Sequence, residues 1–311
     1  MSRTITSASS RDDLGPGWDT PAWHPHARTG SGLEHLVPVP ATIREPLCIG
    51  LNPGTGVPLK LPLFDDLGGK VVVISAKKAA GLTTLLDDVN ERITACPDAR
   101  LIQISLSRTC GVRRWEPLAA AAAYGPAAGR AGQILRFAEA AIGERSRGRG
   151  RLARVHQPTP GEPLYVLEIE GTRELTEANP EAAGLLEWIT RMCRLQGWAV
   201  ILAGPRSLDA AAGGAAIVSS TGVAVLGQST RPFGQGPGGP VTCGAGVPGL
   251  FGVYTLPFDG TCQRGRAFWW GGDGDLVAPV VAARLATQPA HELEPALASL
   301  QDRWDQIRAG A

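Results

Sequence analysis

The sequence predicts an α/β protein in which helices cover both faces of a mostly parallel sheet. Between residues 70 and 204, short apolar runs of strand length alternate with segments of helical periodicity. Because neighbouring parallel strands are joined by crossover connections, which are usually helices, this alternation is typical of a parallel sheet. The 311 residues are enough for one such domain with a full hydrophobic core.

Charge and composition exclude several other classes of protein. The chain has 30 Lys and Arg residues against 29 Asp and Glu residues, so any basic patch must be local. No apolar run reaches the ~18–20 residues that span a bilayer, and the N-terminus lacks the apolar core of a secretory signal. The six cysteines are scattered without a CxxC pair. We therefore expect a soluble cytoplasmic protein with reduced thiols and no cysteine-bound metal.

The chain divides into an N-terminal arm, an α/β domain and a C-terminal helix. Residues 1–44 are rich in Pro, Gly and Ser with little periodicity, which predicts a flexible arm. The domain is expected over 45–285 and an amphipathic helix over 286–311. The first elements of the domain are predicted as a hairpin over 47–64, strands over 70–75, 99–107, 163–170 and 197–204, and helices over 83–93, 127–145 and 180–195.

The last third of the chain is less regular. Gly and Pro dominate 227–252, which predicts long loops, and a strand is expected over 266–272. A short helix is expected over 276–286 with an interruption near Pro279. The C-terminal helix has an apolar stripe that docks either on the body of the protein or on another subunit, formed by Leu297, Leu300, Trp304 and Ile307.

The segment VVVISAKKAAGLTTLLD is a strand that runs into a turn of small residues and then into a helix. This is the layout of a phosphate-binding loop, whose consensus G-x-x-x-x-G-K-[ST] falls on Ala76, Gly81, Leu82 and Thr83. The second glycine and the hydroxyl that faces Mg²⁺ are present, and Thr84 follows Thr83. Ala76 replaces the first glycine, and Leu82 replaces the lysine that binds the β- and γ-phosphates. The sequence therefore keeps the layout of the loop without its charge.

Two interpretations of this loop stay open. In the first, it is a strand-to-helix turn that binds no ligand. In the second, the backbone N–H groups of Gly81, Leu82 and Thr83 hold a phosphate, because these donors and the helix dipole do not depend on the lysine. Lys77 and Lys78 either supply charge from an unusual direction, since Lys77 lies where a deviant class of phosphate loops has its lysine, or form a solvated tip.

One basic run, ERSRGRGRLARVH, alternates arginine with glycine. Its arginines are Arg145, Arg147, Arg149, Arg151 and Arg154. A flexible cationic tether of this kind suits contact with DNA phosphates, which requires charge but no base-specific groups. The alternative is a solvated connector between a helix and a strand.

In their order and spacing, these features resemble the motor domain of the FtsK/SpoIIIE family of DNA-pumping ATPases, especially its TraB-like and small actinobacterial members. The resemblance covers about residues 45–285 and implies a RecA-like P-loop NTPase fold. The residues that carry it, besides the hairpin and the loop, are the Trp-x-Pro at Trp115-Glu116-Pro117, the strand end Leu167-Glu168-Ile169-Glu170-Gly171 in place of a hydrophobic-Asp-Glu motif, and Leu202-Ala203-Gly204-Pro205-Arg206 in place of L-A-T-Q-R.

The resemblance implies roles for three further side chains. Glu170 takes the acidic position of the second motif, and with Thr83 it would hold Mg²⁺ if a nucleotide binds. Arg206 lies at the position that senses the γ-phosphate. The implied cofactors are ATP and Mg²⁺. The implied partners are double-stranded DNA and further subunits, either copies of this chain or an active FtsK-like protein.

Several positions depart from the family pattern. Gly171 replaces the glutamate that activates water, Pro205 replaces the sensor glutamine, and Glu168 is expected to point to the opposite face of its strand. We therefore expect a pseudo-ATPase or a very weak ATPase that serves as a nucleotide-binding, DNA-binding or subunit-docking module in DNA transfer or segregation. The alternatives are an active DNA translocase that uses Lys77 or Lys78 with Glu170, and a structural protein that binds no nucleotide.

Overall fold

The computed structural model describes most of the chain from residue 41 to residue 309. The described residues are 41–52, 54–76, 80–106, 111–148, 155–204, 222–227, 234–236, 239–241, 249–255, 262–268, 276–287 and 291–309. The predicted flexible arm lies outside them, apart from 41–44.

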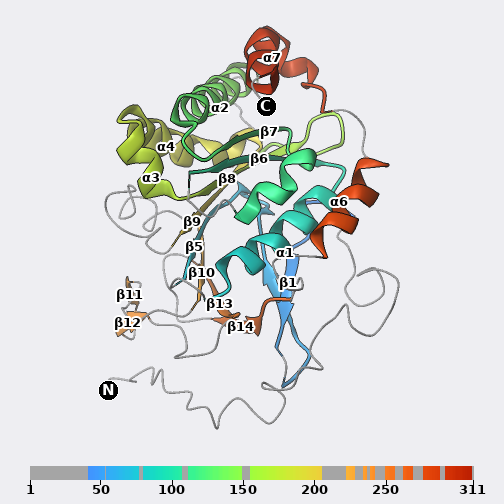
Figure 1. The fold of residues 1–311 in the computed structure, drawn as a ribbon, viewed down its shortest axis with the longest axis vertical. Helices are drawn as coiled ribbons and strands as arrows, with labels where there is room; N and C mark the ends of the chain where they lie inside the picture. The colour runs from blue at the N-terminus through green and yellow to red at the C-terminus, as the bar shows by residue number, and fades with distance from the viewer. Residues whose placement is uncertain are drawn as a thin grey trace.

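A ten-stranded sheet with the order β2-β1-β14-β13-β10-β5-β9-β8-β6-β7 forms the centre of the protein (Figure 1). The strands from β10 to β7 in this order run parallel, and β13, β14, β1 and β2 extend the sheet antiparallel. The bounds are β1 Leu47–Leu51, β2 Pro58–Leu61, β5 Val71–Ser75, β6 Ala99–Ser105, β7 Ala121–Tyr124, β8 Leu164–Glu170, β9 Trp198–Gly204, β10 Val223–Leu226, β13 Leu250–Thr255 and β14 Gln263–Arg266. Two short pairs lie outside this sheet, β3 Phe64–Asp65 with β4 Gly68–Gly69, and β11 Gly234–Gly236 with β12 Gly239–Val241.

Helices cover both faces of the parallel strands, as predicted (Figure 1). One face carries α1 (Leu82–Ala95), the 3₁₀ helix η3 (Gly111–Leu118) and α6 (Val277–Leu285). The other carries α2 (Ala128–Gly148), α3 (Thr172–Ala178), α4 (Glu181–Met192) and α7 (Gln301–Ala309), with the 3₁₀ turns η4 (Cys193–Gln196) and η7 (Pro295–Leu300). We call these the α1 face and the α2 face.

The alternation of side chains along the strands divides the interior into two cores. In β5, Val72 and Ile74 pack in the core of the α1 face, whereas Val71 and Val73 pack in the core of the α2 face. Since both faces are covered, the parallel strands are apolar along most of their length. This explains why their sequences are continuous apolar runs rather than alternating ones.

The predicted hairpin, the parallel strands and the helices after them are confirmed, with some differences in extent. Helix α2 continues to Gly148, three residues past its predicted end. Strand β14 ends at Arg266, so the strand expected over 266–272 begins earlier than predicted. Pro279 does not interrupt α6, because it lies in the first turn, where the missing N–H has no helical partner to lose. The all-alanine start of β7 gave no strand pattern, and this strand was not predicted.

The apolar stripe of the C-terminal segment docks on the body of the protein. Its four apolar side chains are all buried in the core of the α2 face, and the ring of Trp304 lies 4.9 Å from that of Phe137 in α2. Of the two docking modes left open by the sequence, the intramolecular one is therefore formed.

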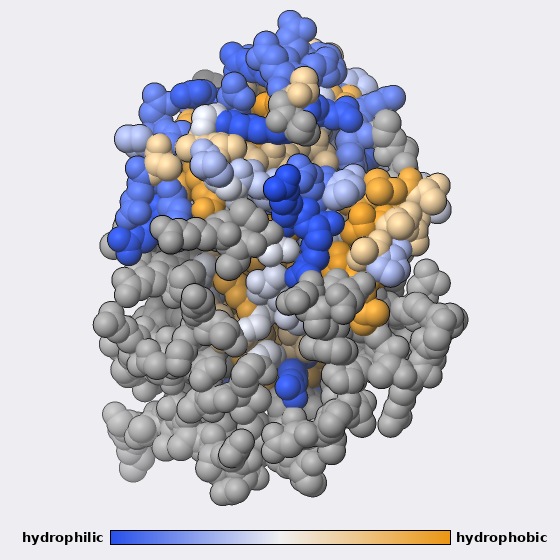
Figure 2. Space-filling view, viewed as in Figure 1, coloured by the Kyte–Doolittle hydropathy of each residue, from blue (hydrophilic) through white to orange (hydrophobic). Residues whose placement is uncertain are grey.

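The exposed surface over α2 and α7 is hydrophilic, whereas apolar side chains, among them the 49% exposed Leu285, gather over α6 (Figure 2).

Candidate functional site

The carboxyl ends of the parallel strands bring the predicted site residues to one edge of the sheet. In the register of the ladder, Ser75 at the end of β5 lies opposite Gly204 of β9, and Glu170 of β8 lies between Ala203 of β9 and Ser105 of β6. The loop after β5 and the acidic end of β8 are therefore separated by a single strand, β9. This is the edge at which open α/β sheets bind ligands.

The turn into α1 is held by glycines on both sides. Gly81 precedes the helix with φ of 89°, a left-handed conformation that favours glycine. A Cβ on Gly81 would lie 3.2 Å from the Cα of Gly249, whose N–H donates to the carbonyl of Ala80 at 2.9 Å. Ala76, at the first-glycine position, is buried beside Gly227. Lys77 and Lys78 lie outside the described residues.

Leu82, which aligns with the lysine of the consensus, packs against the interior. Leu82 is half-buried and packs against the core of the α1 face. Thr83 and Thr84 are half-buried as well, and Thr83 lies against the backbone of Gly111, at the start of η3. The first turn of α1 therefore offers backbone donors and a hydroxyl, while its aliphatic residue contributes to packing.

Glu170 is buried at the end of β8. Its Oε2 accepts a 2.6 Å hydrogen bond from the hydroxyl of Ser105, which fixes the carboxylate at the edge of the sheet. The next residue, Gly171, has φ of 85° and precedes α3. The position at which the family resemblance expects the water-activating glutamate is thus a glycine in a left-handed turn, with no side chain to accept a proton.

Glu168 lies on the same face of β8 as Glu170, so the prediction that it points to the opposite face was wrong. Strand side chains alternate with a period of two, and residues 168 and 170 therefore share the α1 face. The Oε1 of Glu168 accepts from Gln103 Nε2 at 3.2 Å and Asn90 Nδ2 at 3.4 Å. Its Oε2 is buried and has no hydrogen-bond partner among the described residues. The pKa of Glu168 is raised to about 8, mainly by burial and also by the nearby Glu170 carboxylate, against the opposing hydrogen bonds from Asn90 and Gln103.

The sequence analysis did not predict a further acidic residue near this edge, Asp87. Asp87 of α1 is buried, and its carboxylate receives Arg114 Nε at 2.9 Å, Arg114 Nη2 at 2.7 Å and Trp115 Nε1 at 2.8 Å. Burial raises its pKa to about 6 against the opposing effect of Arg114. An acidic residue four positions after Thr83, on the same side of the helix, was the available signal.

The residues at this edge fit Mg²⁺ and a nucleotide only in part. Magnesium prefers oxygen ligands, which the Thr83 hydroxyl and the Glu170 carboxylate can supply, and the N-terminus of α1 suits an anionic phosphate. Within the described residues, no cluster of three or more His, Cys, Asp or Glu side chains is arranged to hold a metal ion. Arg206 and Pro205 lie outside the described residues.

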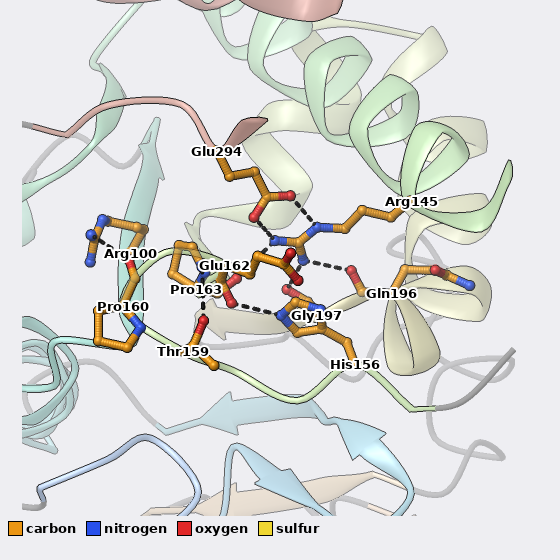
Figure 3. A network of polar contacts seen from close by, with 10 residues as sticks. All are labelled: Arg100, Arg145, His156, Thr159, Pro160, Glu162, Pro163, Gln196, Gly197 and Glu294. Carbon is orange, nitrogen blue, oxygen red and sulfur yellow. Dashed lines mark hydrogen bonds and ion pairs between the residues drawn. The ribbon is translucent and has the colours of Figure 1, made fainter. Parts of the chain in front are cut away.

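The predicted DNA-binding run begins with a residue that cannot contact DNA. Arg145 is buried in α2 and forms a bidentate ion pair with Glu294, with Nε–Oε1 and Nη2–Oε2 distances of 2.7 and 2.5 Å (Figure 3). Its remaining N–H groups donate to the carbonyls of Gln196, Gly197 and Pro163. The prediction is therefore corrected for Arg145, which cross-links α2 to the C-terminal segment.

The next arginine of the run is exposed. Arg147 is on the last turn of α2, its side chain is 72% exposed, and it pairs with Glu144 at 3.1 Å. The helix thus includes the start of the run, which was expected to be a flexible tether. Arg149, Arg151 and Arg154 lie outside the described residues. None of the described helices is both long and apolar enough to cross a membrane.

The sequence matches no protein-family model, and no curated protein sequence is significantly similar to it. Solved structures of ATPases are similar in fold. The cytoplasmic domain of the Thermomonospora curvata type VII secretion ATPase EccC aligns with a TM-score of 0.64 and 18% identity, over 83% of this chain and 33% of EccC. The pCW3 conjugation coupling protein TcpA, in its monomer form with ATPγS, aligns with a TM-score of 0.56 and 13% identity, over 86% of this chain and 75% of TcpA.

A third similar structure is EssC (ATPases 2 and 3) from Geobacillus thermodenitrificans, with a TM-score of 0.51 and 10% identity, over 88% of this chain and 52% of EssC. This chain therefore spans a third of the EccC chain and about half of the EssC chain. At these identities the likeness shows the fold alone. The chain has the RecA-like P-loop ATPase fold, with its mostly parallel sheet between two layers of helices.

Proposed function

We propose that this protein is an FtsK/SpoIIIE-like pseudo-ATPase, which binds a nucleotide at the N-terminus of α1 and hydrolyses it very slowly or not at all. The observation that supports the proposal best is the packing of Leu82 against the core at the position of the catalytic lysine. A leucine side chain has no charge with which to bind a phosphate. Nucleotide binding would then depend on backbone N–H groups and the Thr83 hydroxyl.

The size of the expected defect follows from the charge that is missing. Removing one preorganised group that stabilises the transition state costs about 2.7–4 kcal/mol, a factor of about 100–1,000 in rate. The glycine at position 171 removes a second contribution, because it offers no base. Bound Mg²⁺ would neutralise phosphate charge, but it would supply neither the lysine nor the base.

The assembly in which such a protein acts is inferred from its structural neighbours. EccC is a secretion ATPase and TcpA a conjugation coupling protein, and both share the fold at low identity. We infer that this chain serves as a nucleotide-responsive or docking subunit, in a homo-oligomer or beside an active FtsK-like subunit. Double-stranded DNA is the proposed further partner, through Arg147 and the arginines that follow it.

Mg-ATP binding and hydrolysis by the pure protein test this proposal together. A ligand at 100 times its dissociation constant adds about 2.7 kcal/mol to the stability, which a melting curve detects. We expect Mg-ATP to raise the melting temperature of the parent. Thr83→Val should raise the dissociation constant of Mg-ATP about tenfold, because Thr83 is aligned with the Mg²⁺-facing hydroxyl. The neighbouring Thr84→Val should change that constant by less than about twofold.

Each contrary outcome favours one of the alternatives. Turnover similar to that of an active motor, abolished by Lys77→Ala or Lys78→Ala, would show a working ATPase with a deviant loop. A melting temperature unaffected by Mg-ATP would favour a structural protein that binds no nucleotide.

A further inference from the structure

The helix η3 lies beside the first turns of α1 and contacts it at two points. The first point is Gly111, where an added Cβ would lie 2.5 Å from Thr83 Cγ2 and 3.1 Å from Thr83 Oγ1. The second point is Asp87, which receives Arg114 and Trp115. The family resemblance gives no role to Gly111, Asp87 or Arg114.

The spacing of the two points is matched on the two helices. Thr83 and Asp87 are four residues apart in an α-helix, which rises about 1.5 Å per residue, so they are separated by about 6 Å along its axis. Gly111 and Arg114 are three residues apart in a 3₁₀ helix, which rises about 2.0 Å per residue, again about 6 Å. The two contacts are therefore spaced by about the same axial distance on the two helices.

The contact at Asp87 is strong enough to hold η3 in place. The carboxylate is 1% exposed and binds the Arg114 guanidinium through two charge-assisted bonds, while the Trp115 indole donates a third. Val112, Trp115 and Leu118 of η3 are buried in the core of the α1 face. By contrast, Arg113 is 67% exposed and pairs with Glu116 within η3 itself.

The contact at Gly111 acts on the Thr83 side chain. A β-branched residue in a helix has few χ1 rotamers, and both branches of Thr83 face the Gly111 backbone. Only a residue without Cβ allows η3 to approach this closely. The η3 backbone therefore restricts where the Thr83 hydroxyl can point.

We propose that η3 positions the phosphate-loop hydroxyl, with Asp87 fixing η3 against α1 and Gly111 setting the orientation of Thr83. For its ligand, this inference rests on the proposed function, since Mg²⁺ bound with a nucleotide is what the hydroxyl would meet. The positioning itself is a property of the protein without ligand.

A double-mutant cycle tests the contact at Gly111. Gly111→Ala should lower the melting temperature by at least about 2 °C, because the new methyl group overlaps Thr83 Cγ2. Thr83→Ser removes that methyl but keeps the hydroxyl, so in its background Gly111→Ala should cost much less. Gly129→Ala, in α2 with nothing within 4 Å of the new Cβ, is the control and should not couple to Thr83→Ser.

Hydrogen exchange tests the contact at Asp87. Asp87→Asn and Arg114→Ala should each accelerate exchange of the first hydrogen-bonded amides of α1, those of Leu85 and Leu86, at least about fivefold, whereas Arg113→Ala in η3 should not. If Mg-ATP binds, these two variants and Gly111→Ala should also weaken it about tenfold, and Gly111→Ala with Thr83→Ser should regain part of the loss.

The outcomes separate the inference from the proposed function. Coupling at Gly111 and faster exchange without any nucleotide binding would support positioning by η3 and contradict the proposed nucleotide site. Additive effects of Gly111→Ala and Thr83→Ser, or unchanged exchange at Leu85 and Leu86 in Asp87→Asn and Arg114→Ala, would overturn the inference whether or not a nucleotide binds.

Discussion

At the scale of single residues, the edge of the sheet combines an apolar replacement with buried acids. Leu82 aligns with the lysine of the phosphate-loop consensus and packs against the core, while Glu168 and Glu170 lie on β8. The hydrogen bonds from Asn90 and Gln103 to a single Glu168 oxygen leave the other oxygen without a partner among the described residues. Two predictions follow from the chemistry of these side chains.

Glu168→Gln should stabilise the protein at neutral and higher pH. The folded protein holds a proton on Glu168 up to a pKa of about 8, whereas the unfolded chain releases it near 4.5, so the free energy of unfolding falls as pH rises between these values. Glutamine keeps the acceptor for Asn90 and Gln103 without the buried charge. At pH 8 we expect a gain of at least about 1.4 kcal/mol, the equivalent of one pKa unit.

Urea denaturation of both proteins at pH 5 and pH 8 measures this difference. The gain should shrink towards pH 5, where Glu168 is protonated in the folded state. Glu174→Gln, at an exposed position of α3, provides the control and should show no such pH dependence. A variant that is less stable than the parent at both pH values would contradict the interpretation of Glu168 as a buried acid with one oxygen unpaired among the described residues.

Leu82→Lys restores the lysine of the loop but should not restore a motor. The ammonium group can bind phosphates, so we expect tighter Mg-ATP binding, by about tenfold or 1.4 kcal/mol. Removing a half-buried aliphatic group should cost about 1 kcal/mol of stability. Turnover should stay at least about 100-fold below that of an active relative, because the glycine after Glu170 provides no base.

Calorimetric titration and a steady-state phosphate-release assay check this prediction. Leu82→Met, which keeps the volume and the apolar character, should bind Mg-ATP as the parent does. Motor-like turnover by the lysine variant would show that Leu82 alone limits hydrolysis.

At the scale of helices and strands, a buried ion pair joins the C-terminal segment to α2. Arg145 and Glu294 are both less than 5% exposed, and the guanidinium also lies 5.1 Å from the Tyr165 ring centre. The partners of Arg145 come from the residues just before β8 and β9 and from the segment before η7. The pair thus lies at the opposite edge of the sheet from the phosphate loop.

Arg145→Met should destabilise the protein by about 3–5 kcal/mol, because it leaves the Glu294 carboxylate buried and unpaired. The double variant with Glu294→Leu removes both charges and should recover at least half of that loss. Arg147→Ala, two residues away at an exposed position, should change stability by less than about 0.5 kcal/mol. Urea denaturation of the four proteins measures these free energies of unfolding. A double variant no more stable than Arg145→Met would show that the hydrogen bonds of Arg145 to backbone carbonyls contribute more to stability than its pairing with Glu294.

At the scale of the whole molecule, a near-neutral chain can bind DNA only through a local cluster of charge. Since Arg145 is buried, the cluster available from the arginine run consists of Arg147, Arg149, Arg151 and Arg154. Contacts of this kind would be non-specific in sequence and sensitive to salt.

Replacing Arg147, Arg149 and Arg151 by alanine should weaken binding to duplex DNA and lower its salt dependence. Each phosphate contact contributes about 0.9 to the slope of log affinity against log salt, so losing up to three contacts should reduce the slope by up to about 2.7. Anisotropy titrations at several salt concentrations measure both quantities. Arg145→Met, provided that it folds, is the control and should keep the parental slope. Equal slopes in the parent and the triple variant would show that the arginine run is a solvated connector.

The sequence by itself determined the features that depend on neighbours along the chain. Continuous apolar runs identified the parallel strands, and the small residues after Ile74 identified the turn into α1, because backbone conformation and strand burial leave a local pattern. The glycine at position 81 was recognised for the same reason, as a motif position that also has a left-handed φ.

Only the tertiary structure decided which distant residues meet. The partner of Arg145 is 149 positions away, Gly111 reaches Thr83 across the space between two helices, and β7 becomes a strand by pairing with β6 rather than by its own sequence. Contacts of this kind are selected by packing and by the burial of charge over the whole fold. A pattern read along the chain does not contain them, and for that reason an arginine predicted to bind DNA is instead part of the interior.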